Sequence, residues 1–161
     1  MNRLFRTVRG NRGVEIAEFA VVLPLFLIIM FSIVDFGLYS FVQHTLQFAT
    51  REGVRLALVG RTLTDASGNQ LTREASIIKT IDDYASVAVK PSQLQISIYP
   101  VNTDYSDPTD WLITQNAGGP GSYMRVKTRY SYTFITPLIA ALMPNGKLVI
   151  QSQATYRNER F

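Results

Sequence analysis

Residues 10–42 read GNRGVEIAEFAVVLPLFLIIMFSIVDFGLYSFV, and this stretch decides the fold. A basic leader ends at Gly13, and Glu18 stands at the start of an apolar run. No charge occurs from Phe19 to Val34; the run is interrupted at Asp35 and then resumes. A carboxylate at the edge of such a segment costs free energy unless it finds a partner.

The apolar run is long enough to cross a membrane. Phe19 to Val42 comprises 24 residues, which at about 1.5 Å per residue exceed a hydrocarbon core of about 30 Å. The alternative is the buried helix of a soluble protein, but the rest of a 161-residue chain is too small to enclose it. We therefore expect a long helix over residues 14–60 that includes a transmembrane segment, residues 19–42, with Pro24 inviting a kink.

The charge distribution predicts the orientation of this helix. The net charge of +4 comes entirely from four arginines in residues 1–13, because the remainder has twelve Lys and Arg against twelve Asp and Glu. Positive charge before a span favours a cytoplasmic N-terminus, so we expect an extracytoplasmic C-terminal part. The high pI is therefore no sign of nucleic-acid binding, and we expect no nucleic-acid partner.

Residues 61–161 are expected to form a small α+β domain. Thr72 offers an N-cap for a second helix over residues 73–88, which Pro91 ends. Strand signals cover residues 94–98, 123–134 and 148–156, so that the domain has an antiparallel sheet of about three strands. A short helix over residues 138–143, opened by Pro137, lies between the last two strands.

The strand over residues 123–134 alternates between two faces. Its even-numbered residues are mostly apolar and are expected to face the core, while Arg125, Lys127 and Arg129 lie on the other face. We expect this basic face to be solvated; contact with an anionic surface or nucleic acid is the alternative.

The composition gives no support for catalysis. The chain has no cysteine, which excludes disulfides and thiol chemistry, and its only histidine, His44, cannot build a histidine-rich metal site. We find no Ser/His/Asp set, phosphate loop or paired catalytic carboxylates. We therefore expect a protein that is not an enzyme and has no cofactor; a membrane-tethered enzyme would require a pocket lined by the loop 101–122.

The junction at Gly13 and Val14 is suited to proteolytic processing. Glycine leaves the backbone accessible to a peptidase at the membrane face. Cleavage after Gly13 would create an α-amine on Val14, and the amine of a neighbouring subunit could then neutralise Glu18 within a packed set of helices. Alternatively, Glu18 lies among the headgroups and pairs with Arg12.

One single aspartate and one group of three aspartates are further candidate sites. Asp35 would either contact a partner helix and fix its register, or lie hydrated near the outer interface. Asp104, Asp107 and Asp110 recur at every third position of a polar loop, which makes them a weak calcium candidate, because they lack the glycine and the closing glutamate of an EF-hand. A solvated polar loop is the more ordinary explanation.

The sequence RGVEIAEFAVVLP of residues 12–24 resembles the N-terminal signature of the TadE-like pseudopilins, which are minor pilin-like proteins of tight-adherence (Flp-type) pilus systems. The segments IVDFG (33–37), ATREGVR (49–55) and ATYRNE (154–159) resemble later parts of the same pattern. Residues 61–122 carry nothing assignable to the family. The major Flp subunits are very short, so a chain with a sizeable domain resembles a minor subunit.

The resemblance implies a maturation pathway and a location. A prepilin peptidase would cleave after Gly13, which places Glu18 and Phe19 at mature positions five and six. The precursor would lie in the bacterial inner membrane, and its partners would be other pilins or pseudopilins and the pilus assembly machinery that serves cell adhesion. The alternative is an uncleaved membrane-anchored scaffold or binding protein.

Overall fold

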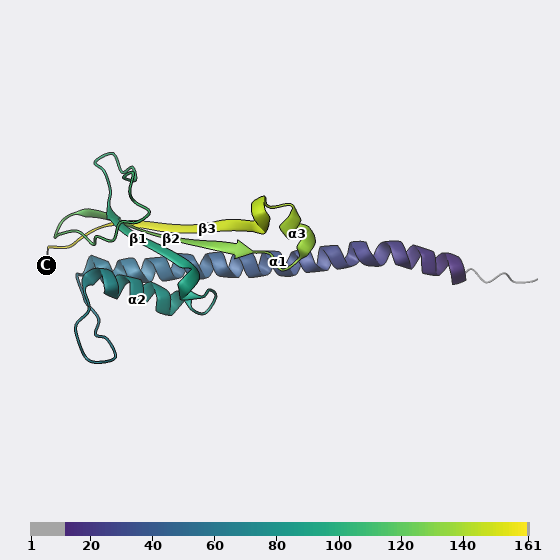
Figure 1. Ribbon diagram of the computed structural model, residues 1–161, viewed down its shortest axis with the longest axis horizontal. Coiled ribbons are helices and arrows are strands. Elements are labelled where there is room, and N and C mark those ends of the chain that lie inside the picture. Colours follow the sequence, from purple (N-terminus) through teal and green to yellow (C-terminus); the bar gives the residue numbers. More distant parts are fainter. Residues whose placement is uncertain (1–11, 161) are drawn as a thin grey trace, which may run out of the picture.

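One helix forms the axis of the molecule (Figure 1). The computed structural model describes residues 12–160, and within it helix α1 runs from Arg12 to Leu58, 47 residues that continue through Pro24. At about 1.5 Å per residue this helix is about 70 Å long. Its N-terminal half projects away from the other elements, which gather along its C-terminal half.

A second helix packs beside the C-terminal half of α1. Helix α2 runs from Arg73 to Ala85, and the Thr72 hydroxyl caps it by accepting the Ala75 N–H at 3.2 Å. The helix ends three residues before the expected Ala88. The reason is a tight turn, in which the N–H groups of Ala88 and Val89 both donate to the Ala85 carbonyl and Val89 enters the core.

Three antiparallel strands complete the domain in the order β1-β2-β3. They are β1 (Leu94–Pro100), β2 (Tyr123–Thr133) and β3 (Lys147–Arg157). The short elements are η1 (Pro91–Gln93) before β1, and α3 (Pro137–Ala141) and η2 (Pro144–Gly146) between β2 and β3. The expected α+β architecture is therefore confirmed, with strand ends shifted by one or two residues.

One face of the sheet packs against the two helices. The predicted alternation in β2 is confirmed, because Met124, Val126 and Thr128 are fully buried. Thr50 of α1 and Thr128 of β2 lie in the centre of this contact with their hydroxyls 2.9 Å apart, so that each buried hydroxyl has a partner. The other core residues include Val42, Leu46, Ala49, Ala57, Ile77, Ile81, Ile96, Ile98, Ile150 and Tyr156.

The two helices approach each other closely at Gly53. A Cβ atom added at Gly53 would lie 2.5 Å from Cγ1 and 2.8 Å from Cδ1 of Ile81, a side chain with no solvent exposure. Ile81 has no free space to move into, since it is enclosed by the core. The glycine is therefore required by the packing of α1 on α2.

We predict that Gly53→Ala lowers the stability of the full chain in detergent by about 1–2 kcal/mol, because overpacking outweighs the gain in helix propensity. Gly37→Ala is the matched control, since a Cβ at Gly37 meets nothing within 4 Å. That control should be neutral or slightly stabilising. Thermal unfolding followed by circular dichroism measures both, and equal melting temperatures for the two variants would contradict the prediction.

Candidate functional site

The N-terminal half of α1 has no covering element in the described chain. None of residues 13–34 is buried, and only 6% of the most apolar 18-residue window is buried. The helix therefore does not fit the alternative of a core helix in a soluble protein. By length and composition it could span a membrane.

The predicted processing site lies at the beginning of this exposed half. Gly13 and Val14 are both exposed, and a Cβ added at Gly13 would meet nothing within 4 Å. Nothing within the described chain thus requires glycine there, although glycine inside a helix costs about 1 kcal/mol relative to alanine. Residues 1–11 and the Arg12 side chain, and with them the leader and the proposed Arg12 partner of Glu18, lie outside the described residues.

Glu18 and Phe19 are exposed side chains of the second turn of α1. No ion pair found within residues 12–160 involves Glu18. Phe19 is 62% exposed, which is far more than a large aromatic side chain shows in a packed core. The structure therefore presents both residues outward, toward whatever surrounds the helix.

Asp35 is the first buried side chain along the described part of α1. Its side chain is buried, with 1% exposure, and its two oxygens accept hydrogen bonds from the backbone N–H groups of Ile135 at 3.0 Å and Thr136 at 2.8 Å. A carboxylate is a strong acceptor for backbone amides. The carboxylate thus ties α1 to the β2–α3 connection of its own chain, an interaction that the sequence analysis did not anticipate.

Aromatic rings reinforce this attachment one turn further along α1. Tyr39 makes an edge-on contact with Tyr132, at 5.8 Å between ring centroids, and stacks with Phe134 at 6.4 Å. Tyr132 and Phe134 also contact each other edge-on at 5.2 Å. Offset and edge-to-face geometries of this kind are favourable. The end of β2 is therefore fixed to α1 by polar and aromatic contacts together.

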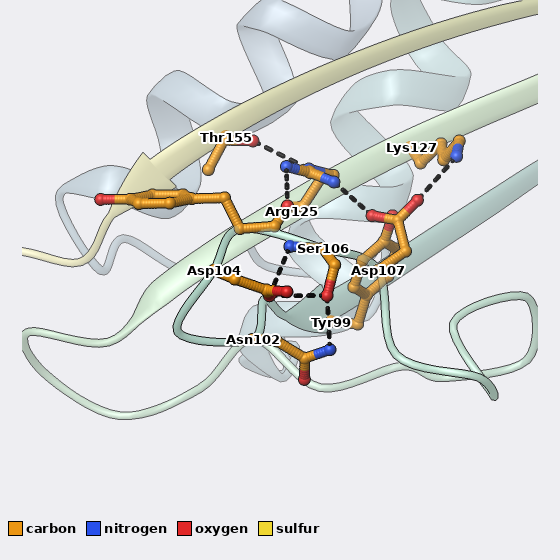
Figure 2. A network of polar contacts seen from close by, with 9 residues as sticks. Tyr99, Asn102, Asp104, Ser106, Asp107, Arg125, Lys127 and Thr155 are labelled. Carbon is orange, nitrogen blue, oxygen red and sulfur yellow. Dashed lines mark hydrogen bonds and ion pairs between the residues drawn. The ribbon is translucent and has the colours of Figure 1, made fainter.

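The loop 101–122 is held by a polar network around Asp107 (Figure 2). The Tyr99 hydroxyl donates to Asp107 Oδ1 at 2.8 Å, and Lys127 Nζ donates to Oδ2 at 3.0 Å. The Arg125 guanidinium also donates to Oδ1, and it reaches the Tyr105 carbonyl at 2.9 Å. One carboxylate thus joins the loop to β1 and β2.

The basic face expected on β2 is therefore not a solvated surface, and that expectation was wrong. The side chains of Arg125 and Lys127 are each only 12% exposed. Trp111 of the loop lies against Lys127 and Arg129: Lys127 Nζ is 4.0 Å and Arg129 Cζ 5.6 Å from its ring centroid, which are cation–π contacts. Arg125 and Lys127 can be covered because Asp107 of the loop supplies their counter-charge, which the sequence of the strand alone does not reveal.

The three aspartates of the calcium candidate have different surroundings. Asp107 is engaged by the cations of β2, Asp104 accepts from the Ser106 hydroxyl at 2.6 Å, and Asp110 is exposed. A search over the described part of the chain finds no group of three or more His, Cys, Asp or Glu side chains that could hold a metal ion. The structure does not bring the three aspartates together as one set of ligands.

A second polar network holds the C-terminal end of the chain, and the sequence did not predict it. The Arg73 guanidinium donates to the carbonyls of Ala57 and Gly118 and to Asn158 Oδ1, at 2.8–3.1 Å. Asn158 Nδ2 in turn donates to the carbonyls of Ala117 and Gly119. These contacts join residues 16 to 85 positions apart, so local sequence pattern carries no signal for them.

The pocket beside the loop 101–122 has a lining that does not suggest catalysis. A shallow pocket of about 390 Å³ is lined by residues 100–103, 105, 122 and 123. Among these lining residues there is no carboxylate, imidazole, ammonium or guanidinium group. General acids and bases are most often such groups, and the titratable side chains that this pocket offers are the phenols of Tyr105 and Tyr123. The pocket therefore gives the membrane-tethered enzyme no support.

The surroundings of Asp107 and Tyr99 shift the pKa values of both side chains. Burial alone would raise the pKa of the Asp107 carboxyl, but hydrogen bonds from Lys127, Tyr99 and Arg125 outweigh burial and hold this pKa below its usual range. Burial together with the Asp107 carboxylate raises the pKa of the Tyr99 phenol. At neutral pH the carboxylate therefore accepts and the phenol donates.

We predict that Asp107→Asn lowers the free energy of unfolding by about 1–3 kcal/mol at pH 7, because it leaves Arg125 and Lys127 part-buried without an anion. The pKa of Asp107 is lowered by folding, so its contribution is present above the usual carboxyl pKa of about 4 and is lost as the pH falls through the lowered value. The difference between the wild type and the variant should therefore disappear in acid.

Trp111 is the only tryptophan in the chain, so its fluorescence reports on the loop during urea unfolding. Asp110→Asn is the control, because Asp110 is an exposed aspartate of the same loop. An equal loss in both variants, or a loss for Asp107→Asn that persists unchanged in acid, would contradict the prediction.

Comparison with known proteins supports the resemblance in α1. Residues 13–55 match the family described as TadE-like protein. No curated protein and no solved structure matches the chain. The matched residues begin at the predicted processing site, include Glu18 and Asp35, and end within α1 near the Gly53 crossing. The resemblance inferred from the sequence is therefore confirmed for this segment, since residues 13–55 are similar to the TadE-like family.

Proposed function

We propose that this chain is a pseudopilin, a minor pilin-like subunit that supports assembly of a tight-adherence (Flp-type) pilus. The observation that carries the proposal is an exposed apolar helix half that begins at Gly13 and lies inside the TadE-like match. The same half bears an exposed Glu18 that has no ion pair among the described residues. A role as a structural subunit accords with this family and with the absence of charged groups from the loop pocket.

The proposed mechanism begins with a membrane precursor. We place the lipid-facing span at residues 14–34, because the domain of the same chain packs on α1 from Asp35 onward. These 21 residues extend over about 31 Å, close to the thickness of a bilayer core. The four leader arginines favour a cytoplasmic N-terminus in the bacterial inner membrane and an extracytoplasmic domain.

Cleavage after Gly13 by a prepilin peptidase then changes what the helix can bind. It removes the four leader arginines, which carry the entire net charge of +4, and creates an ammonium group on Val14. The amine of one subunit can neutralise Glu18 of its neighbour, since both charges need partners near lipid. Helices would thereby pack laterally, with Phe19 at the contact, alongside other pilins, pseudopilins and the inner-membrane machinery.

We predict that Val14 is the N-terminal residue of the mature protein. Mass spectrometry of protein extracted from membranes that contain an active prepilin peptidase should show the loss of residues 1–13. Gly13→Ile should abolish the cut without disturbing the fold, because position 13 is open. Gly37→Ile, the same change at another open helical glycine, should still be cut; an intact leader on the wild-type protein would instead favour an uncleaved scaffold.

We further predict that Glu18→Ala is cleaved normally but assembles poorly. The amount of the subunit that co-purifies with sheared filaments should fall roughly tenfold, which corresponds to about 1.4 kcal/mol of lost interaction. Glu15→Ala, which removes another exposed glutamate of the same helix end, should leave assembly nearly unchanged. Normal filament association of the Glu18→Ala protein would remove this carboxylate from the mechanism.

A further inference from the structure

The connection between β2 and β3 carries an apolar surface that its own domain does not cover. Residues 134–146 read FITPLIAALMPNG, and no charged residue lies between Arg129 and Lys147. Ile135 is 70%, Leu138 49% and Leu142 76% exposed, and α3 buries none of its own residues. A cluster of large apolar side chains rarely faces water on a monomer, so this surface indicates a binding partner.

The position of this connection relative to α1 is fixed. It begins at Ile135 and Thr136, whose backbone N–H groups donate to the Asp35 carboxylate at 3.0 and 2.8 Å. Figure 1 shows α3 at the end of the sheet that is nearest the exposed N-terminal half of α1. The apolar connection therefore lies beside the part of α1 at Asp35, next to the exposed apolar side chains of residues 13–34 and of Phe36.

The proposed span over residues 14–34 sets the level of the connection in a bilayer. From Val14 to Val34 the helix rises about 31 Å, one hydrocarbon thickness. Asp35 and the connection then lie at the outer boundary of that layer. Tyr39, which is part-buried, follows Asp35 by one helical turn, at the level where aromatic side chains collect in membrane proteins, and exposed Lys147 follows the connection.

We propose that residues 134–146 form a second membrane contact, in which Ile135, Leu138 and Leu142 enter the interfacial layer of the bilayer that α1 spans. This inference rests on the proposed membrane anchoring of α1. The observation that favours lipid over a protein partner is continuity: the same rigid unit presents the apolar surface of the helix and that of the connection side by side. A single bilayer covers both.

The proposal gives Asp35 a positioning role. By holding the connection against α1, the carboxylate fixes how deeply the domain sits on the membrane and which side of it faces the lipid. The contact would persist until the subunit leaves the bilayer, when the connection loses its lipid cover together with the helix.

The test uses single-cysteine variants of the full chain, which has no cysteine of its own. Leu142→Cys is labelled with a fluorophore in phosphatidylcholine–phosphatidylglycerol vesicles and quenched either by shallow doxyl-labelled lipid or by aqueous iodide. Ile29→Cys, in the exposed half of α1, is the control for membrane insertion. Ile113→Cys, in the loop 101–122 and 81% exposed, is the control for water.

We expect the label at position 142 to lose most of its fluorescence to the doxyl lipid and little to iodide, and the label at position 113 to show the reverse. Quenching at position 29 but not at position 142 by lipid overturns this inference and leaves the membrane anchor intact. Absence of lipid quenching at position 29 overturns the anchor itself. Protection of position 142 from both quenchers indicates a protein contact and also overturns the inference.

Asp35→Ala tests the positioning role separately. Combined with Leu142→Cys, it should reduce lipid quenching at position 142 and increase quenching by iodide. Combined with Ile29→Cys, it should leave the quenching at position 29 unchanged. Unaltered lipid quenching at position 142 in the Asp35→Ala background would show that the carboxylate does not set the depth of the connection.

Discussion

The packing of one sheet face against the C-terminal half of α1 is the contact on which the rest of the structure depends. It buries the apolar side of β2 and encloses the paired hydroxyls of Thr50 and Thr128. Without the helix, the apolar face of the sheet and the apolar side of α2 would lose the surface against which both are buried. The helix is therefore part of the domain's core as well as its extension.

This arrangement divides α1 into two halves with different chemistry. None of residues 13–34 is buried, whereas the part of α1 after Asp35 places Val42, Leu46 and Ala49 in the core but leaves Phe36, Phe41 and Phe48 exposed. Asp35 is the first buried side chain along the described helix, and it binds two backbone amides. Another environment must therefore cover the apolar side chains that the chain itself leaves exposed.

Much of this architecture could be predicted from sequence because the spacing of apolar residues and the capping residues are local signals. The alternation of Met124, Val126 and Thr128 identified the buried face of β2, and Thr72 identified the start of α2. The attachment of the loop 101–122 to the sheet could not be predicted, because Asp107 finds its cations on β2, 18 and 20 positions away. The same limit applies to Asp35, whose amide partners lie 100 and 101 positions further along the chain. The exposure of Glu18 and Phe19 followed from the helix assignment, whereas their roles depend on neighbours outside one chain.

The parallel course of the sheet and the helix also has a mechanical consequence. β2 and β3 run alongside α1 (Figure 1), and they are paired over eleven residues, from Tyr123 with Arg157 to Thr133 with Lys147. At the far end, the Glu159 N–H donates to the Leu58 carbonyl, and Arg73 joins Ala57 to Asn158. A pull along the helix axis would load the strand pairing in shear, so that many hydrogen bonds must break together rather than one after another. The domain is thus built to transmit tension along its long axis.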